Sequence, residues 1–91
     1  MYTNGSKKGT IRFSVRPQQD AKKVQLLGEF TNWQPVTMRK QKDGHYVSEL
    51  SLTPGPHEYK YLIDGQWTTD PDTSDWALNP FGTANSVAWV K

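Results

Sequence analysis

The sequence predicts an all-β fold, an immunoglobulin-like β-sandwich of about seven antiparallel strands. Three observations predict it: short segments that alternate apolar and polar residues, turn signals about every 8–12 residues, and no segment with a helical period. The 91 residues suffice for one domain with a modest core, and no cysteine is present to add a disulfide or a thiolate metal site. We expect residues 1–9 to form a flexible N-terminal tail and residues 10–91 to form the domain.

Three strands are predicted in the N-terminal half. Residues 10–16 and residues 23–30 alternate in character and are separated by a turn. Gly28 lies among the inward positions of the second segment, where a glycine often marks a bulge or a close backbone approach. Residues 36–42 predict a short, weak strand. The apolar residues expected to face the core are Ile11, Phe13, Val15, Val24 and Leu26.

Residues 45–52 predict the next strand, after a turn signal at residues 43–44. Its inward residues are expected to be Tyr46, Leu50 and Leu52, and its outward residues Val47, Glu49 and Ser51. The proline- and glycine-rich turn at residues 53–56 ends this strand.

The clearest single element is a β-hairpin over residues 57–67. Tyr59, Tyr61 and Ile63 share one face of its first strand, as is typical of a half-buried strand. The Asp-Gly pair at residues 64–65 supplies the positive φ angles that a two-residue type I′ turn requires.

A cation and an indole meet on the other face of this hairpin. A two-residue turn pairs Leu62 with Trp67, and paired residues of an antiparallel ladder point to the same face. Lys60 shares that face, so Lys60 and Trp67 are diagonal neighbours with backbones about 7–8 Å apart. An indole beside a cation on an exposed sheet face is the strongest functional signal in the chain.

Two loops carry large aromatic residues. Trp33 lies in a polar loop before a proline, where it either folds back to cap the core or is displayed for recognition. Residues 68–84 form a long connection that contains Trp76 and Phe81. Loops of this length are usually functional or disordered, and the apolar residues argue against disorder. Residues 85–91 close the domain as a strand of ambiguous facing.

The charge is unevenly distributed along the chain. Residues 1–44 contain nine Lys or Arg against three Asp or Glu, whereas residues 45–91 contain two against six. The basic residues occur as scattered pairs next to turns, which indicates solvated edges. No apolar run approaches the roughly 20 residues of a membrane span, and the N-terminus lacks the apolar region of a signal peptide. We therefore expect a soluble, cytoplasmic protein.

Catalytic and metal-binding signals are sparse. His45 and His57 lie beside turns without the spacing of metal ligands, and we interpret them as ordinary surface histidines. The carboxylates of residues 70–75 lack the calcium-loop pattern. Glu49 and Glu58 could be neighbours, but nothing marks them as an acid–base pair. We therefore expect a binding module rather than an enzyme, with no catalytic residue, no metal site and no cofactor.

Three aromatic residues lie outside the alternating core pattern: Trp33, Trp67 and Phe81. Flat aromatic faces suit ligands that have a flat apolar side and a polar edge, a description that fits both pyranose sugars and nucleobases. A single-stranded nucleic acid would need a cationic path beside the aromatic residues. The aromatic-rich C-terminal half is net acidic, which favours a neutral sugar ligand.

Three motifs, in order, carry a resemblance to a known family. They read V-x-L-x-G-x-F-x-x-W from Val24, G-x-x-x-Y-K-Y-x-x-D-G-x-W-x-x-D-P from Gly55, and F-G-T-x-N-S-V from Phe81. This pattern resembles carbohydrate-binding module family 48, the glycogen-binding domain of AMP-activated protein kinase β subunits. Related domains precede the catalytic barrel of glycogen branching and debranching enzymes. The family fold is an immunoglobulin-like β-sandwich, in agreement with the strand pattern.

The resemblance implies a carbohydrate-binding site. Trp33 and Trp67 match the two stacking tryptophans of the family, and Lys60 matches the lysine that bonds sugar hydroxyls. Phe81 matches the apolar residue, commonly leucine, that reaches into the ring of the bound glucan.

The polar part of the implied site lies beyond Phe81. Thr83 and Asn85 match the pair whose side chains hold the edge of the sugar. Ser86 stands where the kinase domains often have a second asparagine. The loop of residues 72–80 is about one residue longer than expected and carries Trp76, which we interpret as a loop anchor rather than an extra sugar contact.

The resemblance implies non-catalytic binding of α-1,4-linked glucans such as glycogen, starch, maltooligosaccharides or cyclodextrin. The implied partners are an α-glucan polysaccharide or oligosaccharide and a catalytic domain in the same or another chain, with no nucleic acid and no membrane. Two alternative functions stay open. The first is a structural accessory domain that packs on the barrel of a branching or debranching enzyme, and the second is a protein-interaction scaffold.

Overall fold

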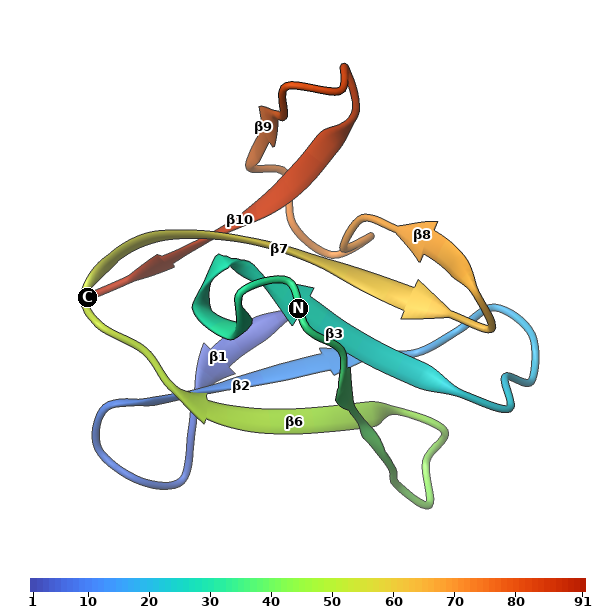
Figure 1. The fold of residues 1–91 in the computed structure, drawn as a ribbon. Helices are drawn as coiled ribbons and strands as arrows, with labels where there is room; N and C mark the ends of the chain where they lie inside the picture. Colours follow the sequence, from blue (N-terminus) through green and yellow to red (C-terminus); the bar gives the residue numbers. More distant parts are fainter.

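Two antiparallel sheets face each other in the computed structural model, which describes residues 1–91 (Figure 1). The first sheet has the strand order β1-β2-β6-β5. Its strands are β1 (Tyr2–Asn4), β2 (Thr10–Val15), β6 (Tyr46–Ser51) and β5 (Arg39–Lys40).

The second sheet has the order β4-β3-β7-β10-β9, and β8 pairs with β7. Its strands are β4 (Val36–Thr37), β3 (Val24–Gly28), β7 (Gly55–Ile63), β10 (Ala84–Val90), β9 (Trp76–Leu78) and β8 (Gln66–Thr68). The one helical element is the short 3₁₀ turn η1 (Glu29–Thr31). The predicted all-β sandwich is confirmed. The structure contains no helix with the length and hydrophobicity that a membrane span requires.

The core lies between the two sheets and follows the predicted alternation. All five inward residues expected on the first two strands are buried, and Phe13, Leu26, Tyr59 and Tyr61 are 0% exposed. Phe13 contacts Tyr59 edge-on across the interface, with ring centroids 4.9 Å apart. Aromatic pairs of this geometry stabilise a core beyond the area that they bury.

Val47 faces outward as predicted, but it is buried rather than exposed to solvent. Its side chain is 5% exposed although it lies on the outer face of β6. The reason is the position of β6 between two partners, because Val47 pairs with Ser14 on one side and with Arg39 on the other. A residue in the middle of a sheet has neighbouring strands on both sides, and alternation along one strand does not reveal their effect on burial.

The hairpin formed by β7 and β8 has the predicted geometry. Asp64 and Gly65 both adopt positive φ angles, 48° and 81°. Leu62 pairs with Trp67 as expected from a two-residue loop. The Asp64 carboxylate also accepts hydrogen bonds from the backbone amides of Lys22 and Lys23, which ties the hairpin turn to the start of β3.

The predicted strand over residues 36–42 divides between the two sheets. β4 pairs with β3 in the second sheet, and β5 pairs with β6 in the first. Met38 lies between them, is buried in the core, and donates its backbone N–H to the Val24 carbonyl. The chain thus crosses from one sheet to the other at a buried side chain. With β1 and β9 added, the structure has ten strands, several of them very short.

The first residues of the chain are more ordered than the expected tail. Tyr2–Asn4 form β1, in which Tyr2 pairs with Phe13. The Tyr2 ring contacts Tyr59 edge-on, and its hydroxyl accepts a hydrogen bond from the Trp89 amide. A polar segment without apolar periodicity therefore still pairs, because one aromatic side chain packs against the core. The boundary between residues 9 and 10 stays a prediction.

A buried carboxylate lies at the end of the core beneath β10. Asp70 is 3% exposed and accepts hydrogen bonds from the hydroxyls of Tyr59, at 2.6 Å, and Tyr61, at 3.3 Å. Its backbone amide donates to Ser86 Oγ, and the N-terminal amine of Met1 contacts its carboxylate. Burial, together with this carboxylate, raises the pKa of both tyrosines far above the ordinary value.

Candidate functional site

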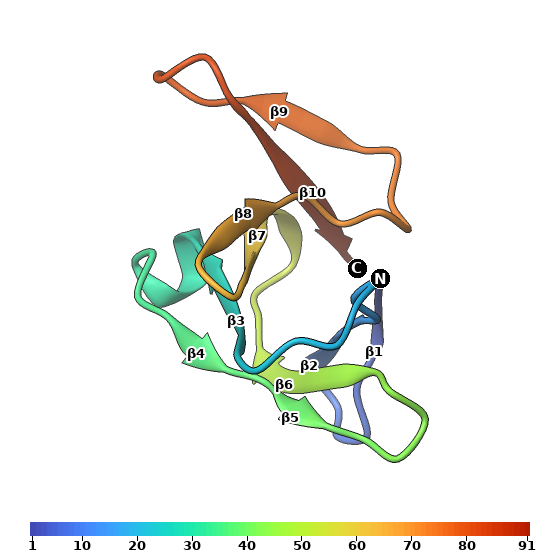
Figure 2. The ribbon, with the colours of Figure 1, turned by 90° about the vertical axis from the view of Figure 1, so that its right-hand side faces the viewer.

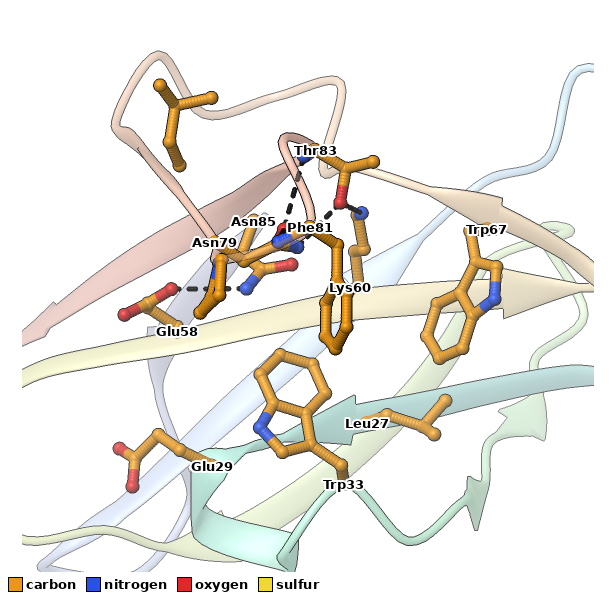
Figure 3. A pocket seen from close by; sticks show the side chains of 12 residues that line it. Leu27, Glu29, Trp33, Glu58, Lys60, Trp67, Asn79, Phe81, Thr83 and Asn85 are labelled. Carbon is orange, nitrogen blue, oxygen red and sulfur yellow. Dashed lines mark hydrogen bonds between the residues drawn. The ribbon is translucent and has the colours of Figure 1, made fainter.

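An open cleft of about 730 Å³ lies on the outer face of the second sheet, on the side away from the first sheet (Figure 3). The six residues that the sequence singles out for sugar binding all line it. The complete lining is Leu27, Glu29, Trp33, Glu58, Lys60, Trp67, Leu78, Asn79, Pro80, Phe81, Thr83 and Asn85. Residues from β3, η1, β7, β8, β9 and β10 and from two loops therefore converge on one surface.

Lys60 and Trp67 form the centre of the cleft. The Lys60 ammonium lies 5.9 Å from the centroid of the Trp67 ring and 3.4 Å from Thr83 Oγ1. Leu27 pairs with Lys60 across β3 and β7, so it supplies apolar surface beneath the cation. Trp67 is 56% exposed. This is unusual, because burying the large apolar surface of a tryptophan side chain stabilises a fold. The register predicted from the hairpin turn thus places the cation beside the indole.

Trp33 reaches the cleft from an irregular loop rather than a strand. Asn32 and Trp33 both have left-handed backbones, with φ angles of 54° and 59°. Such a conformation is unusual for a bulky side chain. Hydrogen bonds hold it, because the Trp33 amide donates to the Gly28 carbonyl and the Thr31 hydroxyl bonds both backbone groups of Gly28. The result is an indole displayed at the cleft rather than one folded over the core.

Gly28 permits this loop to leave β3 close to β7. A β-carbon at this position would lie 2.5 Å from Cε1 of Phe30 and 2.9 Å from the carbonyl oxygen of Glu58. The predicted close backbone approach is confirmed. Phe30 in turn stacks on Phe13 of the core, with centroids 5.4 Å apart, so the Trp33 loop is anchored to the interior.

Phe81 lies at the tip of the loop between β9 and β10 and is 89% exposed. Asn79, which the sequence reasoning missed, organises this tip. Its side-chain oxygen accepts from the amides of Phe81 and Thr83, and its side-chain nitrogen donates to Thr83 Oγ1. Gly82 completes the turn with a φ of 83°. The Asn-Pro sequence before a glycine is a turn signal that could have identified Asn79.

Asn85 and Glu58 form the polar end of the cleft. Asn85 is 5% exposed, and its side-chain nitrogen donates a 3.1 Å hydrogen bond to Glu58 Oε1. Figure 3 shows this pair on the opposite side of Lys60 from Trp67. The sequence offers Glu58 as a possible neighbour of Glu49, but Glu49 lies on the other sheet and contacts Arg12. The hairpin alternation already placed Glu58 on the face of Lys60, which is the signal that could have found it.

Glu29 adds a second carboxylate to the cleft, and His57 holds it there. His57 Nδ1 contacts Glu29 Oε1, and His57 Nε2 donates a 2.6 Å hydrogen bond to the Thr53 carbonyl. The expectation of a surface histidine at position 57 is wrong, because this side chain is 8% exposed. The inward facing of β7 at His57, next to Phe30, explains its burial.

Trp76 does not line the cleft and is 62% exposed on β9. Its predicted role as a loop anchor is therefore not supported by burial. β9 and the loop that follows it extend beyond the rest of the sandwich, as Figure 2 shows, and Trp76, Leu78 and Phe81 on this segment are all exposed. No cluster of three or more His, Cys, Asp or Glu side chains is arranged to hold a metal ion.

Comparisons with known proteins agree with this architecture. The model of the family described as the glycogen recognition site of AMP-activated protein kinase matches residues 11–91. The chain is 39% identical over 70 residues to the AMP-activated protein kinase subunit β-1 of Sus scrofa, an alignment that covers 77% of this chain and 56% of that sequence. It is 37% identical to the human subunit β-1 over the same length, but there spans only 25% of the relative.

Solved structures show the same fold within larger proteins. A maltogenic amylase from S. marinus superposes with a TM-score of 0.75 at 26% identity, covering 90% of this chain and 13% of that enzyme. An α-amylase described as putative, from Salmonella typhimurium, shares the fold with a TM-score of 0.69 at 21% identity, covering 96% of this chain and 14% of that one. The match of the family model across residues 11–91 shows that this chain belongs to the family of AMP-activated protein kinase glycogen recognition domains.

Proposed function

We propose that this chain is a non-catalytic module that binds α-1,4-linked glucans in the cleft between Trp33 and Trp67. Membership of a glycogen recognition family supports carbohydrate binding. The single observation that carries the proposal is the convergence of two exposed indoles, from β8 and from the Trp33 loop, on one cleft that Lys60 also lines. Exposed flat rings with hydrogen-bonding groups at their edges suit a pyranose ring.

The apolar part of the binding energy would come from the indoles. Each glucose unit has a flat face of C–H groups, and stacking removes apolar area from water at about 25 cal/mol per Å². Phe81, exposed at a loop tip that Asn79 holds in shape, adds a third apolar contact against the curved glucan. The loop is already ordered, so less conformational entropy is lost on binding.

The polar part would come from Lys60, Thr83 and Asn85. The Lys60 ammonium donates to sugar hydroxyls, while the Thr83 hydroxyl both donates and accepts. Asn85 uses one amide hydrogen on Glu58, which leaves its carbonyl oxygen and second hydrogen for the sugar. Two or three stacked rings with a few solvated hydrogen bonds correspond to a Kd on the order of micromolar to millimolar.

The cleft suits a neutral ligand better than a nucleic acid. Its lining has one cation, Lys60, and two carboxylates, Glu29 and Glu58. A phosphate backbone requires a continuous cationic path and binds with strong salt dependence. Binding of the proposed glucan should therefore change little between low and moderate salt.

Calorimetric titration with maltooligosaccharides of increasing length tests the proposal, with cellooligosaccharides of equal length as the control. The affinity should rise with the length of the α-1,4 series until the cleft is filled, whereas the flat β-1,4 series should bind at least tenfold more weakly. Equal affinity for both series, or no heat with either, would contradict the proposal.

A second candidate function is a structural accessory domain attached to a catalytic or kinase partner. The observation that favours it is the length of the matching proteins. This chain matches only 25% of the human kinase subunit and 13% of the maltogenic amylase. Titration of the isolated chain with maltoheptaose separates the two functions. A change in tryptophan fluorescence supports glucan binding, whereas no change favours a packing role.

A further inference from the structure

An exposed tryptophan outside the cleft lies on the same outer sheet face. Trp89 on β10 is 57% exposed and is not part of the cleft lining. In the unbroken register of β10 against β7, Val87 pairs with Glu58 and Trp89 pairs with Pro56. Side chains two residues apart on a strand share a face, so Trp89 lies on the face of Asn85 and Glu58.

Trp89 therefore continues the line of cleft residues along β7. Lys60 and Pro56 are four residues apart on that strand, which corresponds to about 13 Å at 3.3 Å per residue. Pro56 is also exposed, so it and the indole form a second flat apolar area beside the polar end of the cleft. The intervening position carries Glu58, an acceptor for hydroxyl groups, and the buried Val87.

We propose that Trp89, with Pro56 beside it, is an outlying subsite that stacks on a glucose unit of an α-glucan chain extending past Asn85 and Glu58. This inference rests on the proposed function of the cleft. Continuity of the sheet face supports this occupant, since a glucan that follows β7 out of the cleft passes Glu58 before it reaches Trp89. A single indole and a proline would be a small area for a stable protein interface.

The subsite makes a prediction about ligand length. A short oligosaccharide that contacts only the cleft should not sense Trp89, whereas a chain long enough to reach β10 should. Calorimetric titrations of the parent and of Trp89→Ala with maltotriose and with maltododecaose test this. We expect unchanged affinity for the trisaccharide and about a fivefold weaker affinity for the long chain.

Two matched variants complete the experiment. Trp76→Ala removes an equally exposed indole from β9, outside the cleft, and should leave both affinities unchanged. Trp89→Tyr keeps an aromatic ring at the subsite and should recover most of the long-chain affinity. Thermal unfolding of each variant checks the fold, because the backbone of Trp89 also bonds to Tyr2.

The outcomes separate this subsite from the cleft. If the parent binds neither sugar, the proposed function fails and the subsite fails with it. If the parent binds both and Trp89→Ala binds the long chain equally well, the subsite alone is overturned, and Trp89 is left as a candidate contact for a protein partner. Equal losses for short and long chains would also overturn it, because they would place Trp89 in the cleft or in the folding of the domain.

Discussion

The outer faces of the two sheets differ, although both sheets contribute their inner faces to one core. On the first sheet the outward side chains include Arg12 and Glu49, which form an ion pair with a nitrogen–oxygen distance of 3.7 Å. On the second sheet the outward face carries Lys60 and Trp67, and the Trp33 loop covers part of it. Only the second face is both aromatic and hollowed.

The second face is hollowed and the first is not because of the loops beside them. The second sheet is overhung by two loops that are held by hydrogen bonds, one presenting Trp33 and the other presenting Phe81. These loops turn a sheet face into a cleft. An outward alternation of polar residues alone, as on β2, produces a solvated surface.

The largest expected effect comes from removing the central indole of the aromatic face. Trp67→Ala should weaken maltoheptaose binding about thirty- to a hundredfold, within the range of ~1–3 kcal/mol known for a base stacked on an aromatic residue. Trp67 is more than half exposed, so the melting temperature should change little. Calorimetry and thermal unfolding measure both. Wild-type affinity in this variant would contradict the placement of the ligand in the cleft.

The next effect tests how the Trp33 loop is attached. Gly28→Ala should reduce the free energy of unfolding by about 1–3 kcal/mol, because the new methyl group overlaps Phe30 and the Glu58 carbonyl. Glucan affinity should fall as well, since Trp33 bonds to Gly28. Urea denaturation and titration measure the two quantities. A control at Ser14 on the first sheet, Ser14→Ala, should retain full affinity.

The stability of the core between the two sheets should depend on pH. In the folded protein the pKa of Tyr59 and Tyr61 is raised, mainly by burial. The stability that they contribute is therefore complete below pH 10, the ordinary pKa, and is lost as the pH rises above it, because only the unfolded state then releases their protons. Tyrosinate absorbance and circular dichroism should change together for these residues. Ionisation of all four tyrosines before unfolding would contradict this.

A smaller effect is expected at the tip of the Phe81 loop. Asn79→Ala removes three side-chain hydrogen bonds around exposed residues. We expect a three- to fivefold weaker affinity, about 0.7–1 kcal/mol, because Phe81 is then ordered only on binding. The melting temperature should fall by a few degrees at most. An affinity loss equal to that of Phe81→Ala would show that the loop does not keep its shape at all without Asn79.

The smallest effect is expected on the first sheet. Arg12→Ala removes one side of a partly exposed ion pair, and such pairs contribute about 0–1 kcal/mol. Glucan affinity should be unchanged. A clear loss of binding in this variant would mean that the first face also contacts the ligand and that the comparison of the two faces is mistaken.

Apolar–polar alternation and turn signals predicted the structure correctly where the facing of a side chain depends only on its own strand. The alternation of β2 and β7 predicted the buried residues, and the Asp-Gly turn predicted the register that brings Lys60 close to Trp67. It missed the burial of Val47, which lies on the outer face between two partner strands, and of His57, which continues the inward alternation of Tyr59 and Tyr61. The family resemblance, not alternation, identified Thr83 and Asn85.

By itself, the sequence determined the sandwich, its core and the pairing of β7 with β8, because alternation and turn chemistry act within a few residues. Tertiary structure alone decided that Trp33 is displayed, that Glu29 enters the cleft, and that Trp89 lies on the same face as Asn85 and Glu58. These placements join η1 and the loop after it with β7 and β10, which are distant in the chain. No local pattern encodes them, since they arise only when the sheet order brings those strands side by side.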